Sequence, residues 1–237
     1  GIRDAQESRG LGDVYKRQSY NIAIDGPAGA GKSTIARKLA ADLGYVYVDT
    51  GAMYRAMAYF FIQNNIACDD EKAIAEACKD VGVTIQYKDN EQQVILNGKN
   101  VNGVIRNEEV GNMASATSVY PVVRTKLVEL QRQLAERENV IMDGRDIGTV
   151  VLPNANVKIY LTASSAVRAK RRYDELTAKG VDCDIKEIEQ DIIERDYRDM
   201  HRETSPLKQA EDAVLLDSSD LDIDGVVAAM KKIIKEA

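Results

Sequence analysis

The 237-residue sequence is poor in the residues that build metal centres and disulfide frameworks. It has one histidine, His201, and three cysteines, which are odd in number and scattered without metal-ligand spacing: Cys68, Cys78 and Cys183. This usage favours reduced thiols in a cytosol and predicts no cysteine or histidine metal cluster. The sequence also lacks an apolar run long enough to cross a bilayer and lacks a signal-peptide core. We therefore expect a soluble, cytoplasmic protein with no membrane partner.

An excess of positive charge is missing as well. The formal net charge is −6, from 32 Lys and Arg against 38 Asp and Glu, which argues against a general nucleic-acid coat. The segment from Arg168 to Arg172 is a concentrated basic cluster, but one such cluster in an acidic protein is weak support for nucleic-acid binding. We predict no nucleic-acid partner, and any polyanion site must be a local concentration of Arg and Lys.

The stretch GPAGAGKST, at residues 26–34, gives the first indication of function. The spacing Gly26-x-x-x-x-Gly31-Lys32-Ser33 fits a phosphate-binding loop, in which backbone N–H groups surround phosphate oxygens, the lysine reaches the outer phosphates and the hydroxyl binds Mg²⁺. A glycine-rich turn between a strand and a helix is the alternative, but it leaves Lys32 and Ser33 unexplained. The stretch predicts a nucleoside triphosphate site formed by Gly26, Pro27, Ala28, Gly29, Ala30, Gly31, Lys32, Ser33 and Thr34.

From Tyr20 onward, short apolar strands alternate with amphipathic helices, which is typical of a parallel sheet covered on both faces. We expect five strands, at residues 20–25, 45–48, 140–143, 157–161 and 214–216, with a helix from the phosphate-binding loop to about Gly44. Between about 81 and 104 the pattern changes to two short antiparallel strands, 83–87 and 93–96, with an Asn-Gly turn after the second. The sequence therefore predicts an α/β doubly wound fold with an inserted antiparallel lobe.

Residues 1–19 have neither strand alternation nor a sustained apolar helical face. We interpret them as a non-native or disordered extension that lies outside a core at 20–237. A functional basic tail is the alternative, and the near balance of charges in this segment makes it weak.

Arginines collect at positions where open α/β sheets bind their ligands. Arg145 follows the strand at 140–143, and Arg55 lies at the start of a helix. Arg195, Asp199 and Arg202 are spaced i, i+4 and i+7, which predicts one helical face for all three. A solvated surface position is the alternative for any one arginine. Together they indicate phosphate clamps, because the guanidinium fork matches phosphate oxygens.

No side chain is placed as an evident general base or nucleophile. A hydroxyl acceptor would require a carboxylate or a histidine to take its proton, whereas a phosphate acceptor is already largely ionised at neutral pH. We expect the single histidine, His201, to be a partly exposed helix residue. The residues therefore favour phosphoryl transfer to an acceptor that is itself a phosphate.

Several motifs, taken in this order, closely resemble those of the bacterial cytidylate kinases. They are GPAGAGKST at 26–34, DTGAMYR at 49–55, DGRDIGTVV at 143–151, LTAS at 161–164 with Arg168, Arg171 and Arg172 after it, and the segment from Arg195-Asp196 through Pro206-Leu207. The resemblance covers the chain from Tyr20 to the C-terminus. It implies the fold of the nucleoside monophosphate kinases: a five-stranded parallel sheet, a monophosphate-binding insert at about 77–117 and a mobile lid at about 172–195. It also implies a monomer.

The resemblance further implies phosphorylation of CMP and dCMP by ATP with Mg²⁺. The loop at 26–34 and Arg171 would hold ATP, Ser33 would bind Mg²⁺, and the catalytic residues would be Lys32, Arg145, Arg195 and Arg202. CMP would be held by Thr50, Arg55, Ser115, Arg124, Arg145, Asp146, Arg195, Asp199 and Arg202. Within this set, Ser115, Arg124 and Asp146 match positions that read the cytosine edge. The alternative for Asp146 is a pair with Arg145 or a turn cap.

Two other functions stay open on the sequence. One is a P-loop kinase for another monophosphate or small acceptor. The other is a nucleotide-dependent switch or a nucleic-acid-binding ATPase, although the sequence has no Asn-Lys-x-Asp motif for reading guanine. ATP consumption that depends on added CMP would separate the kinase from both.

Overall fold

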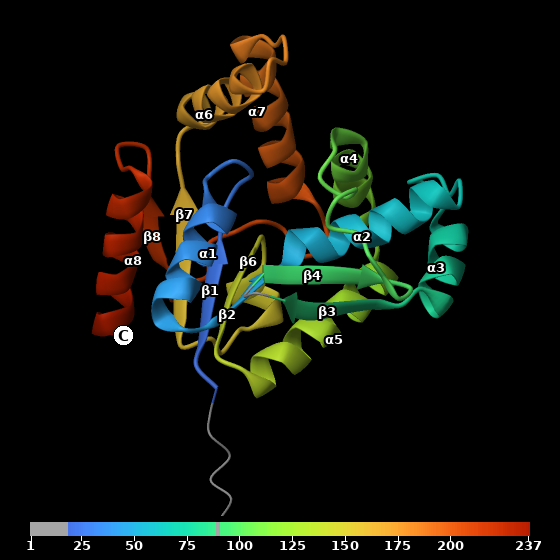
Figure 1. Ribbon diagram of the computed structural model, residues 1–237, viewed down its shortest axis with the longest axis horizontal. Helices are drawn as coiled ribbons and strands as arrows, with labels where there is room; N and C mark the ends of the chain where they lie inside the picture. The colour runs from blue at the N-terminus through green and yellow to red at the C-terminus, as the bar shows by residue number, and fades with distance from the viewer. Residues whose placement is uncertain (1–18, 89–90) are drawn as a thin grey trace, which may run out of the picture.

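The computed structural model describes residues 19–88 and 91–237 (Figure 1). Residues 1–18, which make up nearly all of the expected extension, lie outside the described residues. Ser19, the last residue of that segment, is described: its hydroxyl donates a hydrogen bond to the carbonyl oxygen of Ala135 on α5 (Pro121–Arg137).

A parallel sheet forms the centre of the described chain. Its order is β2-β6-β1-β7-β8, and all four pairings are parallel. The strands are β1 (Asn21–Asp25), β2 (Val46–Asp49), β6 (Val140–Gly144), β7 (Val157–Thr162) and β8 (Val214–Asp217). The five predicted strands and the doubly wound architecture are thereby confirmed, and β1, which leads into the phosphate-binding loop, is the central strand.

Helices cover both faces of this sheet because successive strand residues point to opposite sides. On one face, Ile22 and Ile24 of β1 pack in a core cluster with α1 (Lys32–Leu43) and α8 (Ile223–Glu236). On the other face, Ala23 packs with α2 (Thr50–Gln63) and α5. Helix α1 ends where Gly44 adopts a left-handed backbone conformation, with φ 68°, which confirms the predicted end of this helix.

A second, antiparallel sheet lies beside α2 and β2 (Figure 1). It consists of β3 (Val83–Lys88), β4 (Glu91–Leu96) and the short β5 (Lys99–Asn100), between α3 (Glu71–Asp80) and α4 (Glu108–Thr117). The two predicted antiparallel strands are confirmed, whereas β5, with two residues, was too short to predict. The side chain of Gln92 accepts from the backbone N–H of Asp49 (2.7 Å) and donates to its carbonyl (3.1 Å), which joins this sheet to the edge strand β2.

Two helices, α6 (Ser165–Ala178) and α7 (Ile185–His201), form a hairpin near the carboxyl ends of the parallel strands (Figure 1). A π-helical turn, η1 (Ile147–Val151), follows β6. None of the helices in the described ranges is sufficiently long and apolar to span a membrane.

One prediction about α7 is wrong. The helix ends at His201, and Arg202 has an extended backbone (φ −67°, ψ 143°), so Arg202 does not continue the helical face of Arg195 and Asp199. The chain reverses over the next residues, with Ser205 at φ 49° and the N–H of Leu207 bonded to the carbonyl of Asp199. His201 is exposed, as expected, and its ring stacks on Tyr197 with centroids 4.0 Å apart.

Candidate active site

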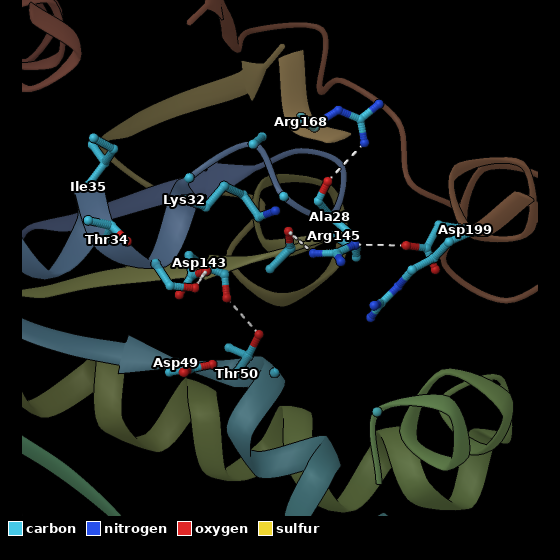
Figure 2. Close-up of a pocket in the computed structure, with 18 of the residues that line it drawn as sticks. Ala28, Lys32, Thr34, Ile35, Asp49, Thr50, Asp143, Arg145, Arg168 and Asp199 are labelled. Atoms are coloured by element: carbon cyan, nitrogen blue, oxygen red, sulfur yellow. Dashed lines mark hydrogen bonds and ion pairs between the residues drawn. The ribbon is translucent and has the colours of Figure 1, made fainter. Parts of the chain in front are cut away.

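A cleft of about 860 Å³ lies where the phosphate-binding loop, α2, α4 and the α6–α7 hairpin meet (Figure 2). In the described part of the chain, ten Lys and Arg residues and seven Asp and Glu residues line it. Every residue that the sequence analysis assigned to CMP lies on its wall: Thr50, Arg55, Ser115, Arg124, Arg145, Asp146, Arg195, Asp199 and Arg202. Residues 28–34 and Arg171 also line the cleft, whereas Gly26 and Pro27 do not.

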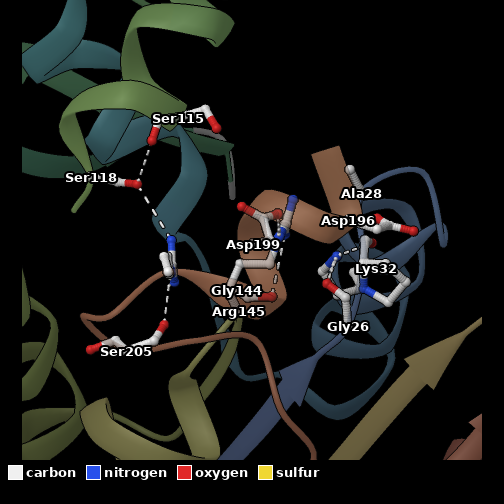
Figure 3. A network of polar contacts seen from close by, with 12 residues as sticks. Gly26, Ala28, Lys32, Ser115, Ser118, Gly144, Arg145, Asp196, Asp199 and Ser205 are labelled. Carbon is white, nitrogen blue, oxygen red and sulfur yellow. Dashed lines mark hydrogen bonds and ion pairs between the residues drawn. The ribbon is translucent and has the colours of Figure 1, made fainter. Parts of the chain in front are cut away.

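The loop between β1 and α1 has the backbone that its glycines permit. Gly26 has φ 149°, and a Cβ there would stand 1.9 Å from the carbonyl oxygen of Leu161, so only glycine fits. The ammonium of Lys32 donates to the carbonyl of Gly26 at 2.7 Å (Figure 3) and to the carbonyl of Pro27 at 2.7 Å. Lys32 is only 6% exposed, and its burial together with the nearby Arg145 guanidinium lowers its pKa. Among the described residues, no carboxylate lies within 4 Å of this ammonium.

The hydroxyl of Ser33 and the carboxylate of Asp143 are oxygen groups of the kind that Mg²⁺ prefers, and they lie side by side. The hydroxyl of Ser33 donates to Asp143 Oδ2 at 2.9 Å, and the hydroxyl of Tyr47 donates to Asp143 Oδ1 at 2.9 Å. Burial, with the neighbouring Asp49, raises the pKa of Asp143. Within 19–88 and 91–237 no group of three or more His, Cys, Asp and Glu residues is arranged to hold a metal. One hydroxyl and one carboxylate suit Mg²⁺ nonetheless, because this ion takes one or two protein ligands and completes its shell with substrate phosphates and water.

Asp25, at the end of β1, was not identified from the sequence. Its carboxylate accepts from the backbone N–H groups of Ile147 (2.8 Å) and Gly148 (2.7 Å), in the turn that follows Asp146. Burial raises the pKa of Asp25 to about 6. An acidic residue that ends an apolar strand directly before the loop was the signal that could have singled it out.

A group of arginines on the cleft wall is not neutralised by carboxylates. Arg55 donates to the carbonyls of Ile105 and Asn107, and Arg202 donates to the carbonyl of Ser205. The buried Nε of Arg195 has no hydrogen-bond partner in the described chain, and its burial, with Arg145 nearby, lowers the pKa of Arg195 to about 10. Within the described ranges, ion pairs to carboxylates are absent for Arg55, Arg171, Arg195 and Arg202. The cleft thus presents positive charge that an anionic ligand would balance.

In the described chain, the other five arginines on the wall are paired with carboxylates, and the pairs of Arg145 and Arg124 join distant parts of the chain. Arg145 Nε donates to Asp199 Oδ2 at 2.9 Å (Figure 2). Burial alone would raise the pKa of Asp199, but the Arg145 guanidinium holds this pKa below its usual value. Arg124 pairs with Asp146, and both are buried. The alternative pairing of Asp146 with Arg145 is therefore wrong, because Arg145 is turned to Asp199.

The Arg124–Asp146 pair lies beside an aromatic ring and a serine-containing turn. The Arg124 guanidinium carbon is 5.7 Å from the centroid of the Tyr54 ring, and the Tyr54 hydroxyl is buried without a partner in the described chain. Ser118 donates to the carbonyl of Ser115 at 3.0 Å (Figure 3). This end of the cleft combines a donor-only guanidinium, an acceptor carboxylate and hydroxyls, which is a set that can read the edge of a flat polar ring.

Two further wall arginines pair with carboxylates that lie far from them in the sequence. Arg106 pairs with Asp49 at 2.6 Å, and Arg168 pairs with Asp196 at 2.5 Å. The sequence indicated Arg168 as a member of a basic cluster, but nothing in its local pattern pointed to a partner 28 residues away.

The fold and the cleft define a P-loop α/β protein, in which the loop residues Lys32 and Ser33 and a group of arginines line one cleft. The family model for cytidylate kinase matches residues 22–236. The cytidylate kinase of Lactobacillus johnsonii is 52% identical over 215 residues, covering 91% of this chain and 94% of that protein. The cytidylate kinase of Exiguobacterium sp. is 48% identical over 220 residues, covering 93% and 98%. A solved shikimate kinase from Bacteroides thetaiotaomicron has a TM-score of 0.48 at 13% identity, covering 91% of this chain and 98% of that chain.

The chain belongs to the cytidylate kinase family. It is a kinase, that is, a phosphotransferase, and the resemblance inferred from its motifs is confirmed.

Proposed function

We propose that this chain transfers the γ-phosphoryl group of ATP to the phosphate of CMP or dCMP, producing ADP and CDP or dCDP. The observation that carries the proposal is the set of wall cations without carboxylate partners in the described chain. Lys32 and Arg171 would hold the donor phosphates, and Arg55, Arg195 and Arg202 would hold the acceptor phosphate or the group in transfer. The relatives at about half identity, which are named cytidylate kinase, support the choice of acceptor.

At the donor end, the backbone N–H groups of residues 28–34 and the N-terminus of α1 would surround the β- and γ-phosphates. Ser33 and Asp143 would hold a Mg²⁺ ion, which, when bound, neutralises charge that develops on the phosphate oxygens. Lys32 is already directed across the loop by its two carbonyl contacts, so little side-chain freedom would be lost when it reaches phosphate.

In the transfer step, an oxygen of the CMP phosphate forms a bond to the γ-phosphorus as the bond from that phosphorus to the bridging oxygen of ADP breaks. The acceptor phosphate has a second pKa near 6, so it is largely dianionic at neutral pH and needs no general base. Catalysis then depends on alignment and on charge stabilisation by Lys32, Arg145 and Arg195. Arg202 would join them at the acceptor phosphate.

The acceptor end would select the base. Asp146, as a carboxylate, accepts hydrogen bonds and would receive the exocyclic amino group of cytosine, whereas uracil presents an oxygen there. Arg124 and Ser115 would serve the acceptor atoms of the base. Thr50 would lie beside the bound monophosphate, and Asp199 would contact its sugar.

The lobe and the helical hairpin would move around these substrates. We infer that residues at about 77–117 form the monophosphate-binding insert and that residues at about 172–195 form a lid, which would close to exclude water from the transferred group. The protein would work as a monomer in the cytoplasm and supply pyrimidine nucleoside diphosphates.

A product analysis tests this function. Purified protein is mixed with ATP, Mg²⁺ and CMP and followed by ³¹P NMR, and the proposal predicts that CDP and ADP appear in equal amounts. Omission of CMP should stop the loss of ATP. Chelation of Mg²⁺ should stop both the loss of ATP and the formation of CDP. Rapid ATP hydrolysis without CMP would instead favour an ATPase.

A further inference from the structure

One guanidinium joins three separate segments of the chain. Arg168, in the first turn of α6, is only 4% exposed. Its Nε donates to the carbonyl of Ala163 at 2.9 Å, and its Nη1 donates to the carbonyl of Ala28 at 2.8 Å (Figure 2). The carboxylate of Asp196, on α7, accepts from Nη1 at 3.1 Å and from Nη2 at 2.5 Å. The start of α6, the phosphate-binding loop and α7 therefore meet at one side chain.

The contact with Ala28 bears on the donor end of the cleft. Gly29 has φ 77°, and a Cβ there would stand 3.5 Å from the Cβ of Arg168, so the loop also packs on the arginine stem. Because a trans peptide is planar, directing the Ala28 carbonyl toward Arg168 directs the N–H of Gly29 the opposite way. In a loop rich in glycine, this bond fixes the orientation of a peptide that lines the phosphate site.

The contact with Asp196 bears on the other side of the reaction. Asp196 directly follows Arg195 and precedes Asp199 by three residues, and both neighbours line the cleft. A two-point pair between a planar guanidinium and a carboxylate restricts rotation as well as distance. Figure 3 shows Asp196 near Ala28 of the loop. The pair therefore sets how α7 presents Arg195 and Asp199 to the cleft.

A purely structural link between α6 and α7 is already present elsewhere. The hydroxyl of Ser165 donates to Glu189 Oε1 at 2.8 Å, between the same two helices. A buried ion pair by itself is a weak source of stability, because desolvation offsets much of its attraction. Stability alone thus explains poorly why a buried arginine pairs with α7 and bonds to the loop at once.

We propose that Arg168 is a positioning residue for phosphoryl transfer, which keeps the phosphate-binding loop and Arg195 in register through Ala28 and Asp196. The inference rests on the proposed function. The contacts of Arg168 with Ala28 and with Asp196 can be tested separately. Loss of the Asp196 carboxylate releases α7 alone, whereas loss of the Arg168 guanidinium releases both α7 and the loop.

The experiment compares five variants with wild type: Asp196→Ala, Arg168→Met, the double variant of these two, Ser165→Ala and Arg168→Lys. Two quantities are measured, the Kd for MgADP in the absence of acceptor and kcat with CMP at saturating MgATP. Asp196→Ala should lower kcat about tenfold to a hundredfold, because a catalytic group is misplaced, while the MgADP Kd changes by less than about twofold. Arg168→Met should impair both quantities, and the double variant should be no worse than Arg168→Met.

Ser165→Ala serves as the matched control, since it removes a contact between the same helices away from the loop, and it should leave both quantities within about twofold of wild type. Arg168→Lys, which keeps charge and stem without the fork, guards against an unfolded methionine variant and should show the same pattern more weakly. The proposal is overturned if the losses of kcat from Asp196→Ala and Arg168→Met multiply in the double variant, or if Ser165→Ala matches Asp196→Ala.

Failure of the proposed function gives a different result. Wild-type protein would then leave CMP unphosphorylated, and the inference would be judged on MgADP binding alone. Weaker binding by Arg168→Met, with normal binding by Asp196→Ala and Ser165→Ala, would still support the contact with the loop, and equal binding by all variants would refute it.

Discussion

The two ends of the cleft are built in different ways. At the end that we propose for the donor, Lys32 is held by carbonyls five and six residues before it in the chain. At the end that we propose for the acceptor, Arg124 pairs with a carboxylate 22 residues away and Arg145 with one 54 residues away. A contiguous loop can recognise phosphates by its backbone alone, whereas an assembly of distant side chains can recognise a particular base. We therefore expect substitutions in the loop to change turnover with every acceptor, and substitutions in the paired side chains to change the preference among bases.

The largest expected effect comes from the donor end. Lys32→Met should lower kcat by about a hundredfold to a thousandfold, because the ammonium stabilises charge that develops in transfer. The CMP to UMP preference should stay unchanged, since the substitution does not touch the base site. Steady-state kinetics with both monophosphates check this, with Lys79→Met, an exposed lysine on α3, as control. Near-normal turnover would mean that this loop does not hold the donor phosphates.

The next prediction concerns the acceptor end. Asp146→Ala should lower kcat/KM for CMP about a hundredfold, and that for UMP by much less, because only cytosine loses a hydrogen bond to the carboxylate. The measurement is kcat/KM for both substrates at saturating ATP, with Asp174→Ala on the exposed face of α6 as control. Equal proportional losses would show that Asp146 supports the pocket by pairing with Arg124 without reading the base.

A third prediction concerns Asp25, which links the two ends by bonding the turn after Asp146. Its pKa is raised from 3.8 to about 6 on folding. Since the pKa of Asp25 is higher in the folded state, protonation of its carboxyl stabilises the folded protein. This contribution is complete below about pH 4 and is lost as the pH rises through about 6. The free energy of unfolding of wild type, minus that of Asp25→Asn, should fall by about 3 kcal/mol across this window. Urea titrations at several pH values test it, and a constant difference would contradict the burial of an ionisable carboxylate here.

The smallest expected effect isolates one phosphate contact. A Cβ at Gly111, in α4, would stand 3.0 to 3.3 Å from the guanidinium of Arg55, whereas a Cβ at Gly103 would meet nothing within 4 Å. Gly111→Ala should raise KM for CMP a few fold while kcat and KM for ATP stay near wild type, since the arginine is the flexible partner. Gly103→Ala is the matched control. A raised KM for ATP in Gly111→Ala would assign Arg55 to the donor end instead.

The difference between contacts within one segment and contacts between distant segments also explains which parts of the fold and site could be predicted from the sequence. The loop residues Lys32 and Ser33 were predicted because their function follows from spacing along one segment. Strand positions were predicted because β1 and β6 are short, mainly apolar runs between helical segments, and the structure buries both. The pairs Arg168–Asp196 and Arg106–Asp49 could not be predicted, because each joins segments that only the folded chain brings together. Arg202 was misplaced because helical spacing continues in the sequence after the helix has ended.

The claim that matters most is that the acceptor end selects a cytosine monophosphate. The direct measurement is the rate of ADP formation by wild-type protein at saturating MgATP, with CMP, dCMP, UMP, AMP and GMP offered separately at one subsaturating concentration. The account predicts rapid ADP formation with CMP and dCMP, and rates lower by about a hundredfold or more with the purine monophosphates and UMP. Equal rates with UMP, or faster turnover of a purine monophosphate, would contradict it.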